Sequence, residues 1–220
     1  MSSLILIRHG QSEHHVNGLT GGWTDTGLTE LGRHQAACLA SRLKREIADT
    51  PCRMLSSDLK RAFQTAQIVG REIGVNPEPV PELREFNNGM AAGMTTEAAK
   101  PVFREPTEPL HDWQPYPEAD TWRRFYSRVS DWLDHLAGHR DGLLLLVAHA
   151  GTINNIVAWW LGLEIERLSK VAFGAAPASI SVLDVNPWGE QRVERLNDTA
   201  HLYAAGLSGS IPLQTEGDAL

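Results

Sequence analysis

Two histidines in this chain each follow a short run of apolar residues. His9 comes after residues 4–7 and Arg8, and His149 comes after residues 143–148. Apolar runs without alternation are typical of buried parallel strands, and open α/β sheets bind ligands beyond the carboxyl ends of such strands. A neutral imidazole is a nucleophile, and an arginine side chain binds phosphate oxygens. The pattern therefore predicts a phosphate site with a nitrogen nucleophile.

A second arginine is expected to approach the same edge of the sheet. Asp58 is of a residue type that caps helices, which would place Arg61 in the first turn of the next helix. From there we expect Arg61 to face the phosphate from the side opposite Arg8. Gly10 has no Cβ, so we expect it to let the backbone approach the ligand.

Two further residues are candidates for stabilising the transition state and for supplying a proton. His149 precedes a helix expected to begin at Ala150, where free backbone N–H groups favour anions, and its imidazole could stabilise the transferring oxygens. Glu85 lies in an expected loop and is the candidate general acid, because the leaving oxygen of a phosphate ester needs a proton. Glu13 is the alternative acid. Taken singly, each of these residues could instead be a strand-end, capping or surface side chain.

Alternating strands and helices must position these residues. The last two expected strands should form a hairpin around residues 186–189. We predict an α/β fold with three layers: a mostly parallel central sheet with helices on both faces. Apolar spacing, caps and turns predict helices over 29–46, 59–73, 121–136 and 150–161, strands over 4–7, 53–55, 143–148, 179–185 and 191–196, and a small extended piece over 80–83.

A single domain is predicted over residues 1–206. Residues 95–120 hold five of the 12 prolines, which excludes one long helix, and include Trp113 and Tyr116. Because these aromatic side chains need a surface to pack on, we expect an ordered excursion over the active face rather than a linker. Residues 207–220 are expected to form a flexible tail.

Composition restricts the partners and the location. The 220 residues carry a net charge of −7, which argues against binding to nucleic acid or to an anionic membrane. No apolar run approaches the roughly 20 residues of a membrane helix, and the N-terminus fits no signal peptide. Cys38 and Cys52 are expected to be free thiols in a reducing compartment. We therefore expect a cytoplasmic protein whose partner is a small molecule.

Five short motifs, in order, resemble the histidine phosphatase superfamily, which comprises the phosphoglycerate mutase-like enzymes with an Arg-His-Gly motif. The resemblance covers the chain from residue 4 to about residue 202. It implies the phosphoglycerate mutase-like fold and phosphoryl transfer through a phosphohistidine. The motifs are Arg8-His9-Gly10, Leu28-Thr29-Glu30-Leu31-Gly32, Ser56-Ser57-Asp58-Leu59-Lys60-Arg61-Ala62, Leu83-Arg84-Glu85 with Gly89, and His149-Ala150-Gly151.

The resemblance also implies roles for individual residues. His9 is similar to the nucleophile that becomes phosphohistidine. Arg8, Arg61 and His149 resemble the pocket that holds the phosphoryl group through its transition state. Glu85 matches the usual proton donor, which activates water in the second half of the reaction. The family needs no metal or other cofactor, and we expect none here.

The substrate side of the chain departs from the usual pattern of the family. Many members carry an asparagine six residues after the nucleophile, where this chain has His15, with Asn17 two residues further on. Either side chain could contact the phosphate. Ser12 is another candidate for phosphate binding. Gly22 and Trp23 match a substrate-side loop of the mutases, although Trp23 could equally serve packing.

Three functions are compatible with these residues. The leading hypothesis is a phosphomonoesterase that acts on a small phosphorylated metabolite. The alternative is a phosphoglycerate mutase-type phosphotransferase, which shares the first chemical step but usually has a longer insertion between the glutamate and the second histidine. The third is a catalytically inactive protein that binds phosphate esters. The aromatic residues of 95–120 suit a ring-bearing leaving group, whereas the particular ester and the oligomeric state are not determined by the sequence.

Overall fold

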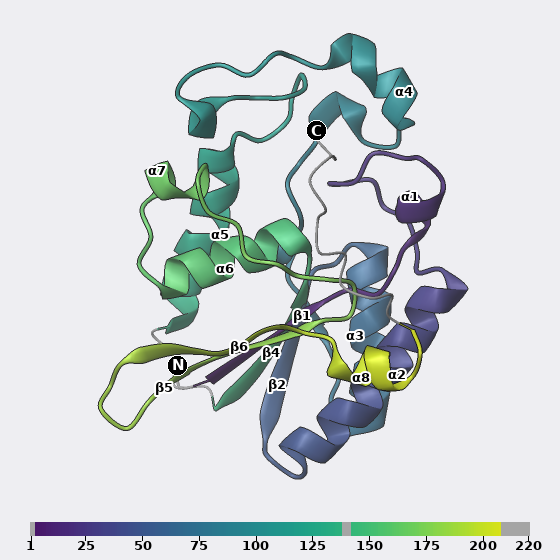
Figure 1. Ribbon diagram of the computed structural model, residues 1–220, viewed down its shortest axis with the longest axis vertical. Helices are drawn as coiled ribbons and strands as arrows, with labels where there is room; N and C mark the ends of the chain where they lie inside the picture. Colours follow the sequence, from purple (N-terminus) through teal and green to yellow (C-terminus); the bar gives the residue numbers. More distant parts are fainter. Residues whose placement is uncertain (1–2, 138–141, 208–220) are drawn as a thin grey trace.

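The computed structural model describes residues 3–137 and 142–207 of the chain (Figure 1). From residue 208 on, the expected tail lies outside the described residues, and Leu207 packs against the protein core. Within the described ranges, no helix is both long enough and apolar enough to cross a membrane. The strands are β1 (Ser3–Arg8), β2 (Cys52–Ser56), β3 (Glu78–Pro79), β4 (Leu143–Ala148), β5 (Ile180–Val185) and β6 (Gln191–Asp198). The α-helices are α1 (Glu13–Val16), α2 (Glu30–Ile47), α3 (Lys60–Ile73), α4 (Thr96–Ala99), α5 (Trp122–Ala137), α6 (Ala150–Trp160), α7 (Ile165–Leu168) and α8 (Ala200–Ala204).

The six strands form one sheet in the order β3-β2-β4-β1-β5-β6. Strands β3, β2, β4 and β1 are parallel to their neighbours in that order, while β5 is antiparallel to β1 and to β6. The register pairs Arg8 with Ala148 and Ser56 with Val147. The residues that directly follow β1, β2 and β4 therefore meet at one edge of the sheet, and His9 and His149 are among them.

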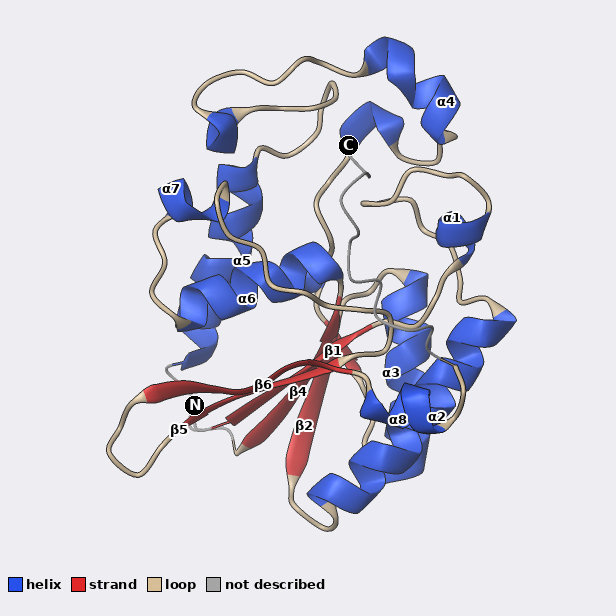
Figure 2. Cartoon of the chain, viewed as in Figure 1, coloured by secondary structure: helices blue, strands red, loops and turns tan. Residues whose placement is uncertain are grey.

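Both faces of the sheet are covered by helices (Figure 2). Leu4, Leu6, Leu144 and Leu146 belong to a core cluster shared with α5 and α6. The intervening strand residues face a second cluster, shared with α2, α3 and α8, whose strand members are Ile5, Ile7, Met54, Leu145, Val147 and Ile180. A strand that is buried on both faces has no polar side, which explains its continuous apolar sequence. The predicted three-layer α/β arrangement is confirmed.

Most of the predicted elements are present, with local corrections. The hairpin of β5 and β6 is confirmed, and the Thr29 hydroxyl accepts the N–H of Gly32 at the start of α2. Asp58 does not cap α3, because the cap residue is Leu59 and the Asp58 carboxylate accepts Arg84 Nε at 2.7 Å. The expected extended piece over 80–83 is a 3₁₀ turn at Pro81–Leu83. Helices α1, α4, α7 and α8 were not predicted, since four or five residues show no helical period.

Close backbone contact explains the glycine that follows His9. A Cβ on Gly10 would lie 2.4 Å from the Gly32 carbonyl oxygen, and a Cβ on Gly32 would lie 1.9 Å from the Gln11 carbonyl oxygen. Both glycines thus allow the loop after β1 to pass against the first turn of α2. This contact gives Gly10 a packing reason to lack a Cβ, and the expected approach of a ligand stays a prediction.

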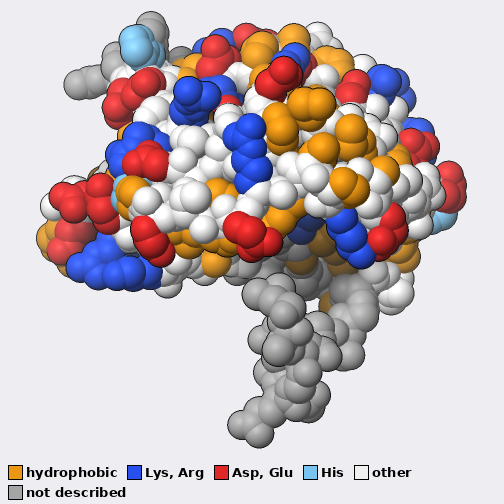
Figure 3. All heavy atoms as spheres, turned by 90° about the horizontal axis from the view of Figure 1, so that it is seen from above, with side chains coloured by type: hydrophobic (Ala, Val, Ile, Leu, Met, Phe, Trp, Pro, Cys, Tyr) orange, Lys and Arg blue, Asp and Glu red, His pale blue; other side chains and the backbone are white. Residues whose placement is uncertain are grey.

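Residues 95–120 form an ordered segment that contains α4 and two 3₁₀ turns (Figure 1). Its aromatic side chains pack on one another, since the Phe103 ring centroid lies 5.6 Å from the ring centroids of both Trp113 and Tyr116. Figure 3 views the molecule from the end at which this segment lies and shows acidic, basic and hydrophobic side chains interspersed. The prolines thus produce a compact excursion with its own side-chain packing.

Candidate active site

Four side chains converge where β1 and β4 end, and we call them the polar pocket: Arg8, His9, Arg61 and His149. Arg61 Nε donates to His9 Nε2 at 3.2 Å, and the rings of His9 and His149 lie edge to face with centroids 5.0 Å apart. His9, Arg61 and His149 each expose 2% of their surface or less. Arginines are seldom buried without an acidic partner, so an arginine held here suits a site for anions.

Backbone contacts fix the orientation and tautomer of His9. Its Nδ1 lies 2.7 Å from the Gly10 carbonyl oxygen, and a carbonyl can only accept, so Nδ1 carries the proton. Nε2 is then left with its lone pair, which accepts from Arg61. Burial, His149 and the two arginines lower the pKa of His9 well below its usual range. The imidazole is therefore neutral at pH 7, the state that a nucleophile requires.

The two arginines are held by backbone carbonyls rather than by carboxylates. Arg61 donates from Nη1 to Thr24 O at 2.8 Å and from Nη2 to Gly22 O at 2.7 Å. Arg8 donates from Nη1 to Ala175 O at 2.6 Å, while its buried Nε has no partner among the described residues. Burial lowers the pKa of Arg61 to about 10, so it stays charged at neutral pH. Since neither arginine forms an ion pair with an acid among the described residues, both charges remain available to an anion.

His149 is held by a serine that the sequence reasoning did not select. His149 Nε2 lies 2.8 Å from the Ser57 hydroxyl, and Ser57 follows β2 at the same edge of the sheet. His149 also occupies the N-cap position of α6, as predicted, and its buried Nδ1 has no partner in the described part of the chain. Burial lowers its pKa well below the usual range. Ser57 directly follows strand β2, and this position at the carboxyl end of a strand was the sequence signal that could have identified it.

Glu85 lies against the start of α6. Its Oε2 accepts the N–H of Gly151 at 2.9 Å, and its Oε1 accepts the N–H of Phe86 at 2.9 Å. A Cβ on Gly151 would lie 2.3 Å from Glu85 Oε1, so only glycine leaves room for this carboxylate. Arg128, also missed by sequence reasoning, donates from Nη2 to the Glu85 carbonyl at 3.0 Å and holds the loop in place. The alternative acid, Glu13, is exposed and accepts from Gly27 N.

The short helix α1 brings His15, rather than Asn17, to the polar pocket. The His15 ring stacks on His9 at 5.7 Å between centroids, and its Nε2 lies 3.3 Å from Arg8 Nη2. Asn17 is exposed and ends α1. Ser12 is buried, and its hydroxyl lies 2.7 Å from His14 Nδ1, so it supports the histidines. Burial and Arg8 lower the pKa of His15 to about 4.

Gly22 and Trp23 position the loop that faces Glu85. Trp23 Nε1 donates to the Glu85 carbonyl at 2.7 Å, and Arg84 lies over the indole ring at 4.8 Å. Gly22 has a positive φ of 59°, and a Cβ there would lie 2.6 Å from Asn88 Oδ1. Of the two interpretations of Trp23, these contacts favour packing. Among the described residues, no group of three histidine, cysteine, aspartate or glutamate side chains is arranged to hold a metal ion.

A cavity of about 500 Å³ lies beside the polar pocket, and we call it the aromatic cavity. Glu85 and Gly151 belong to its lining, so it opens where a proton donor would meet a leaving group. The excursion contributes to its wall. The lining residues are Thr20, Gly21, Gly22, Glu85, Phe86, Asn88, Thr96, Tyr116, Trp122 and Gly151.

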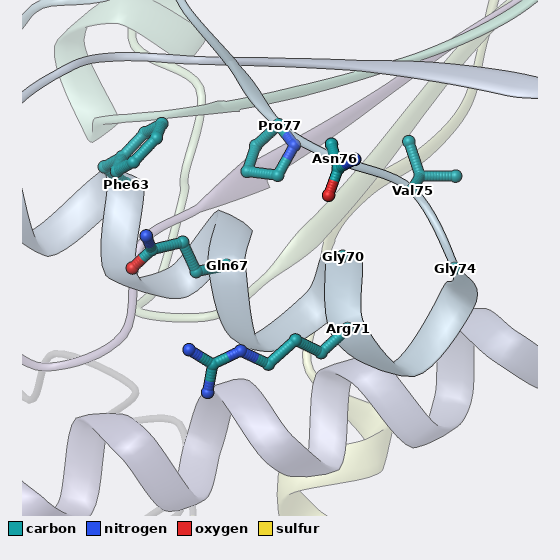
Figure 4. A pocket seen from close by; sticks show the side chains of 8 residues that line it. All are labelled: Phe63, Gln67, Gly70, Arg71, Gly74, Val75, Asn76 and Pro77. Atoms are coloured by element: carbon teal, nitrogen blue, oxygen red, sulfur yellow. The ribbon is translucent and has the colours of Figure 1, made fainter.

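A second cavity, of about 510 Å³, lies at the far end of α3 (Figure 4). Its lining includes Gln67, Arg71 and Asn76 but none of the residues of the polar pocket. Figure 4 shows the Arg71 side chain running along the helix, away from the turn that forms the opposite wall. This cavity lacks a nucleophile, so the polar pocket and the aromatic cavity remain the candidate active site.

Comparisons with known proteins agree with this geometry. Residues 4–199 match the family model of the histidine phosphatase superfamily, branch 1. A glucosyl-3-phosphoglycerate phosphatase of Mycolicibacterium vanbaalenii is 33% identical over 74% of this chain and 76% of its own length. The solved α-ribazole phosphatase of Shigella flexneri is 25% identical, with a TM-score of 0.74 over 89% of this chain and 96% of that protein. A Yersinia pestis protein named as a probable phosphoglycerate mutase is 26% identical over 92% of this chain and 95% of its own length.

Proposed function

The chain belongs to the histidine phosphatase superfamily and is a phosphatase of small phosphate monoesters, and we propose that the phosphoryl group passes through a phosphohistidine on His9. One observation carries this proposal. The bond from His9 Nδ1 to the Gly10 carbonyl leaves Nε2 unprotonated, at 3.2 Å from Arg61 Nε and inside the polar pocket. A neutral imidazole so placed is ready to attack phosphorus.

In the first step, the Nε2 lone pair of His9 forms a bond to phosphorus, and the bond from phosphorus to the ester oxygen breaks. The protonated carboxyl of Glu85 gives its proton to that oxygen, so the product leaves as a neutral alcohol. Arg8 and Arg61 oppose the negative charge on the phosphoryl oxygens. The unpartnered Nδ1 of His149 and Nε of Arg8 supply further polar contacts to those oxygens.

In the second step, the Glu85 carboxylate takes a proton from water, and the water oxygen attacks phosphorus. The bond between phosphorus and Nε2 breaks, inorganic phosphate leaves, and His9 regains its lone pair. The backbone bonds from Phe86 and Gly151 hold the carboxyl group in one position for both proton transfers. The reaction therefore restores the starting state of every residue without a metal ion or another cofactor.

The test is intact-protein mass measured at neutral pH after brief mixing with a phosphate monoester, with released phosphate assayed in parallel. One added phosphoryl group that is absent from His9→Ala, together with released phosphate, is the expected result. A stable adduct without phosphate release would instead support the mutase alternative. Normal turnover by His9→Ala would overturn the mechanism. Turnover by the wild type would also exclude a protein that only binds esters.

A further inference from the structure

The aromatic cavity determines which alcohol the enzyme releases. Resting on the proposed function, we propose that the preferred leaving group is an uncharged alcohol that carries a flat ring. The cavity borders Glu85, so the part of the ester beyond the bridging oxygen lies in it. Its volume of about 500 Å³ falls within the roughly 300–1,000 Å³ of pockets that enclose drug-sized ligands. Such a space exceeds what a three-carbon alcohol fills.

The charges around the cavity disfavour an acidic leaving group. Of the described residues that line the cavity, Glu85 alone carries a charged side chain. Two cations, Lys100 on the excursion and Arg123 on α5, already have acidic partners, since Lys100 binds Glu97 and Arg123 binds Asp112, each at 2.7 Å. A carboxylate on the leaving group would lie near Glu85 without a lysine or arginine in the described lining to balance it. Like charges in such a partly enclosed site repel, so acids are disfavoured.

Aromatic side chains line the cavity from three segments. Phe86 and Trp122 have ring centroids 4.8 Å apart, and Phe125 supports Phe86 edge to face at 5.8 Å. Trp122 is nonetheless 39% exposed, so part of its indole remains available to a ligand. Tyr116 enters from the excursion and is backed by Phe103. Rings held in this way offer flat apolar surfaces on which a planar group can stack.

The polar side chains of the lining are mostly occupied by the protein itself. Thr20 Oγ1 donates to Ala91 O at 2.6 Å, and Asn88 bridges Trp23 N and Thr20. Thr96 donates to Gly18 O at 3.2 Å. The Tyr116 hydroxyl, by contrast, has no hydrogen-bond partner in the described part of the chain. It can therefore bond to a hydroxyl or ring nitrogen of the leaving group.

Three esters separate the effect of the ring from the effect of the charge. Adenosine 5′-monophosphate has an uncharged ring-bearing alcohol, glycerol 3-phosphate has an uncharged alcohol without a ring, and 3-phosphoglycerate has an acidic alcohol. We expect kcat/KM to fall by about tenfold at each step in that order. Hydrolysis of 4-nitrophenyl phosphate, measured alongside, tests the phosphatase chemistry independently.

Variants of the lining connect these preferences to named side chains. Trp122→Ala should remove most of the tenfold advantage of adenosine 5′-monophosphate over glycerol 3-phosphate, and Tyr116→Phe should reduce it by less. Thr96→Lys introduces a cation into the lining and should raise kcat/KM for 3-phosphoglycerate relative to glycerol 3-phosphate by about tenfold. Trp188→Ala is the matched control, because Trp188 is 84% exposed on the distant β5–β6 hairpin.

Failure of the inference and failure of the proposed function give different results. Equal kcat/KM for the three esters, or the highest value for 3-phosphoglycerate, would overturn the inference while 4-nitrophenyl phosphate is still hydrolysed. Unchanged ratios in both Trp122→Ala and Tyr116→Phe would also overturn it. If 4-nitrophenyl phosphate is not hydrolysed and His9 gains no phosphoryl group, the proposed function fails and the inference fails with it.

Discussion

The polar pocket and the aromatic cavity are adjacent but are built in opposite ways. The polar pocket takes its side chains from strand ends and from the first turns of helices that pack on the sheet. His9, Arg61 and His149 are almost fully buried and Arg8 is half-buried, and hydrogen bonds to backbone carbonyls or to the Ser57 hydroxyl fix these side chains. The cavity is lined by loops, by the excursion and by an aromatic residue at the start of α5, and it remains open.

This difference separates the chemistry of the enzyme from its selectivity. Phosphoryl transfer requires reacting groups to be fixed within a fraction of an ångström, which a buried sheet edge provides. The leaving group needs only a surface of suitable shape and charge, which loops can change without disturbing the sheet. Substitutions in the pocket should therefore affect all esters alike, whereas substitutions in the cavity should affect some esters more than others.

The largest loss of activity is expected when His9 is replaced. His9→Asn should lower kcat by at least about 10⁴-fold for every ester, because it removes the nucleophile. His34→Asn is the control, since His34 is an exposed residue of α2. The measurement is phosphate release with each ester, combined with circular dichroism to confirm folding. A residual activity that varies with the ester would contradict the division between pocket and cavity.

Glu85 lies at the boundary between the polar pocket and the aromatic cavity. The loss of rate when it is replaced should therefore depend on the leaving group. Glu85→Gln should slow phosphorylation of His9 by an aliphatic ester by about 10²–10⁴-fold, because the leaving oxygen then receives no proton. Phosphorylation by 4-nitrophenyl phosphate should slow much less, since nitrophenolate leaves without one. Rapid-quench measurement of the phosphorylation step separates this effect from the later attack of water. Equal losses with both esters would exclude Glu85 as the proton donor.

The close backbone contact between Gly32 and Gln11 should contribute to the stability of the folded protein. Gly32→Ala places a Cβ 1.9 Å from the Gln11 carbonyl oxygen, and we expect a loss of about 1–3 kcal/mol in the free energy of unfolding. Gly142→Ala is the matched control, because its Cβ would meet only the Pro51 carbonyl oxygen at 3.7 Å. Urea denaturation of both variants checks this. Equal stability of Gly32→Ala and wild type would show that the loop after β1 shifts freely.

The last prediction concerns the pH dependence of stability. The folded protein holds His9 and His149 neutral with lowered pKa values, whereas the unfolded chain takes up protons below about pH 6.5. The free energy of unfolding should therefore fall as pH falls from 6.5, by up to about 1.4 kcal/mol per pH unit for each buried histidine.

Urea denaturation at pH 7 and pH 5 measures this dependence. His9→Asn should reduce the slope with pH. An identical slope in His9→Asn and wild type would show that His9 is protonated in the folded protein. Substitutions within the aromatic cavity should not alter the slope, because its described lining contains no histidine.

Much of the polar pocket could be predicted from local sequence. Arg8, His9 and His149 lie directly at the ends of apolar strands, and Arg61 lies in the first turn of a helix, so short-range rules placed all four at one edge of the sheet. Arg61 was placed correctly although the reason was wrong: Asp58 binds Arg84 and does not cap α3. The overall resemblance to a known superfamily rested on the same strand ends and helix starts.

What the sequence determined by itself is the α/β fold and the four residues of the polar pocket, because both depend on periodicity and on neighbours along the chain. Only the tertiary structure decided that Ser57 holds His149, that Gly10 serves the packing of α2, and that His15 rather than Asn17 reaches His9. It also assembled the aromatic cavity from segments up to 131 residues apart, Thr20 to Gly151. Such contacts depend on side-chain direction and on distances between remote segments, which no local pattern encodes.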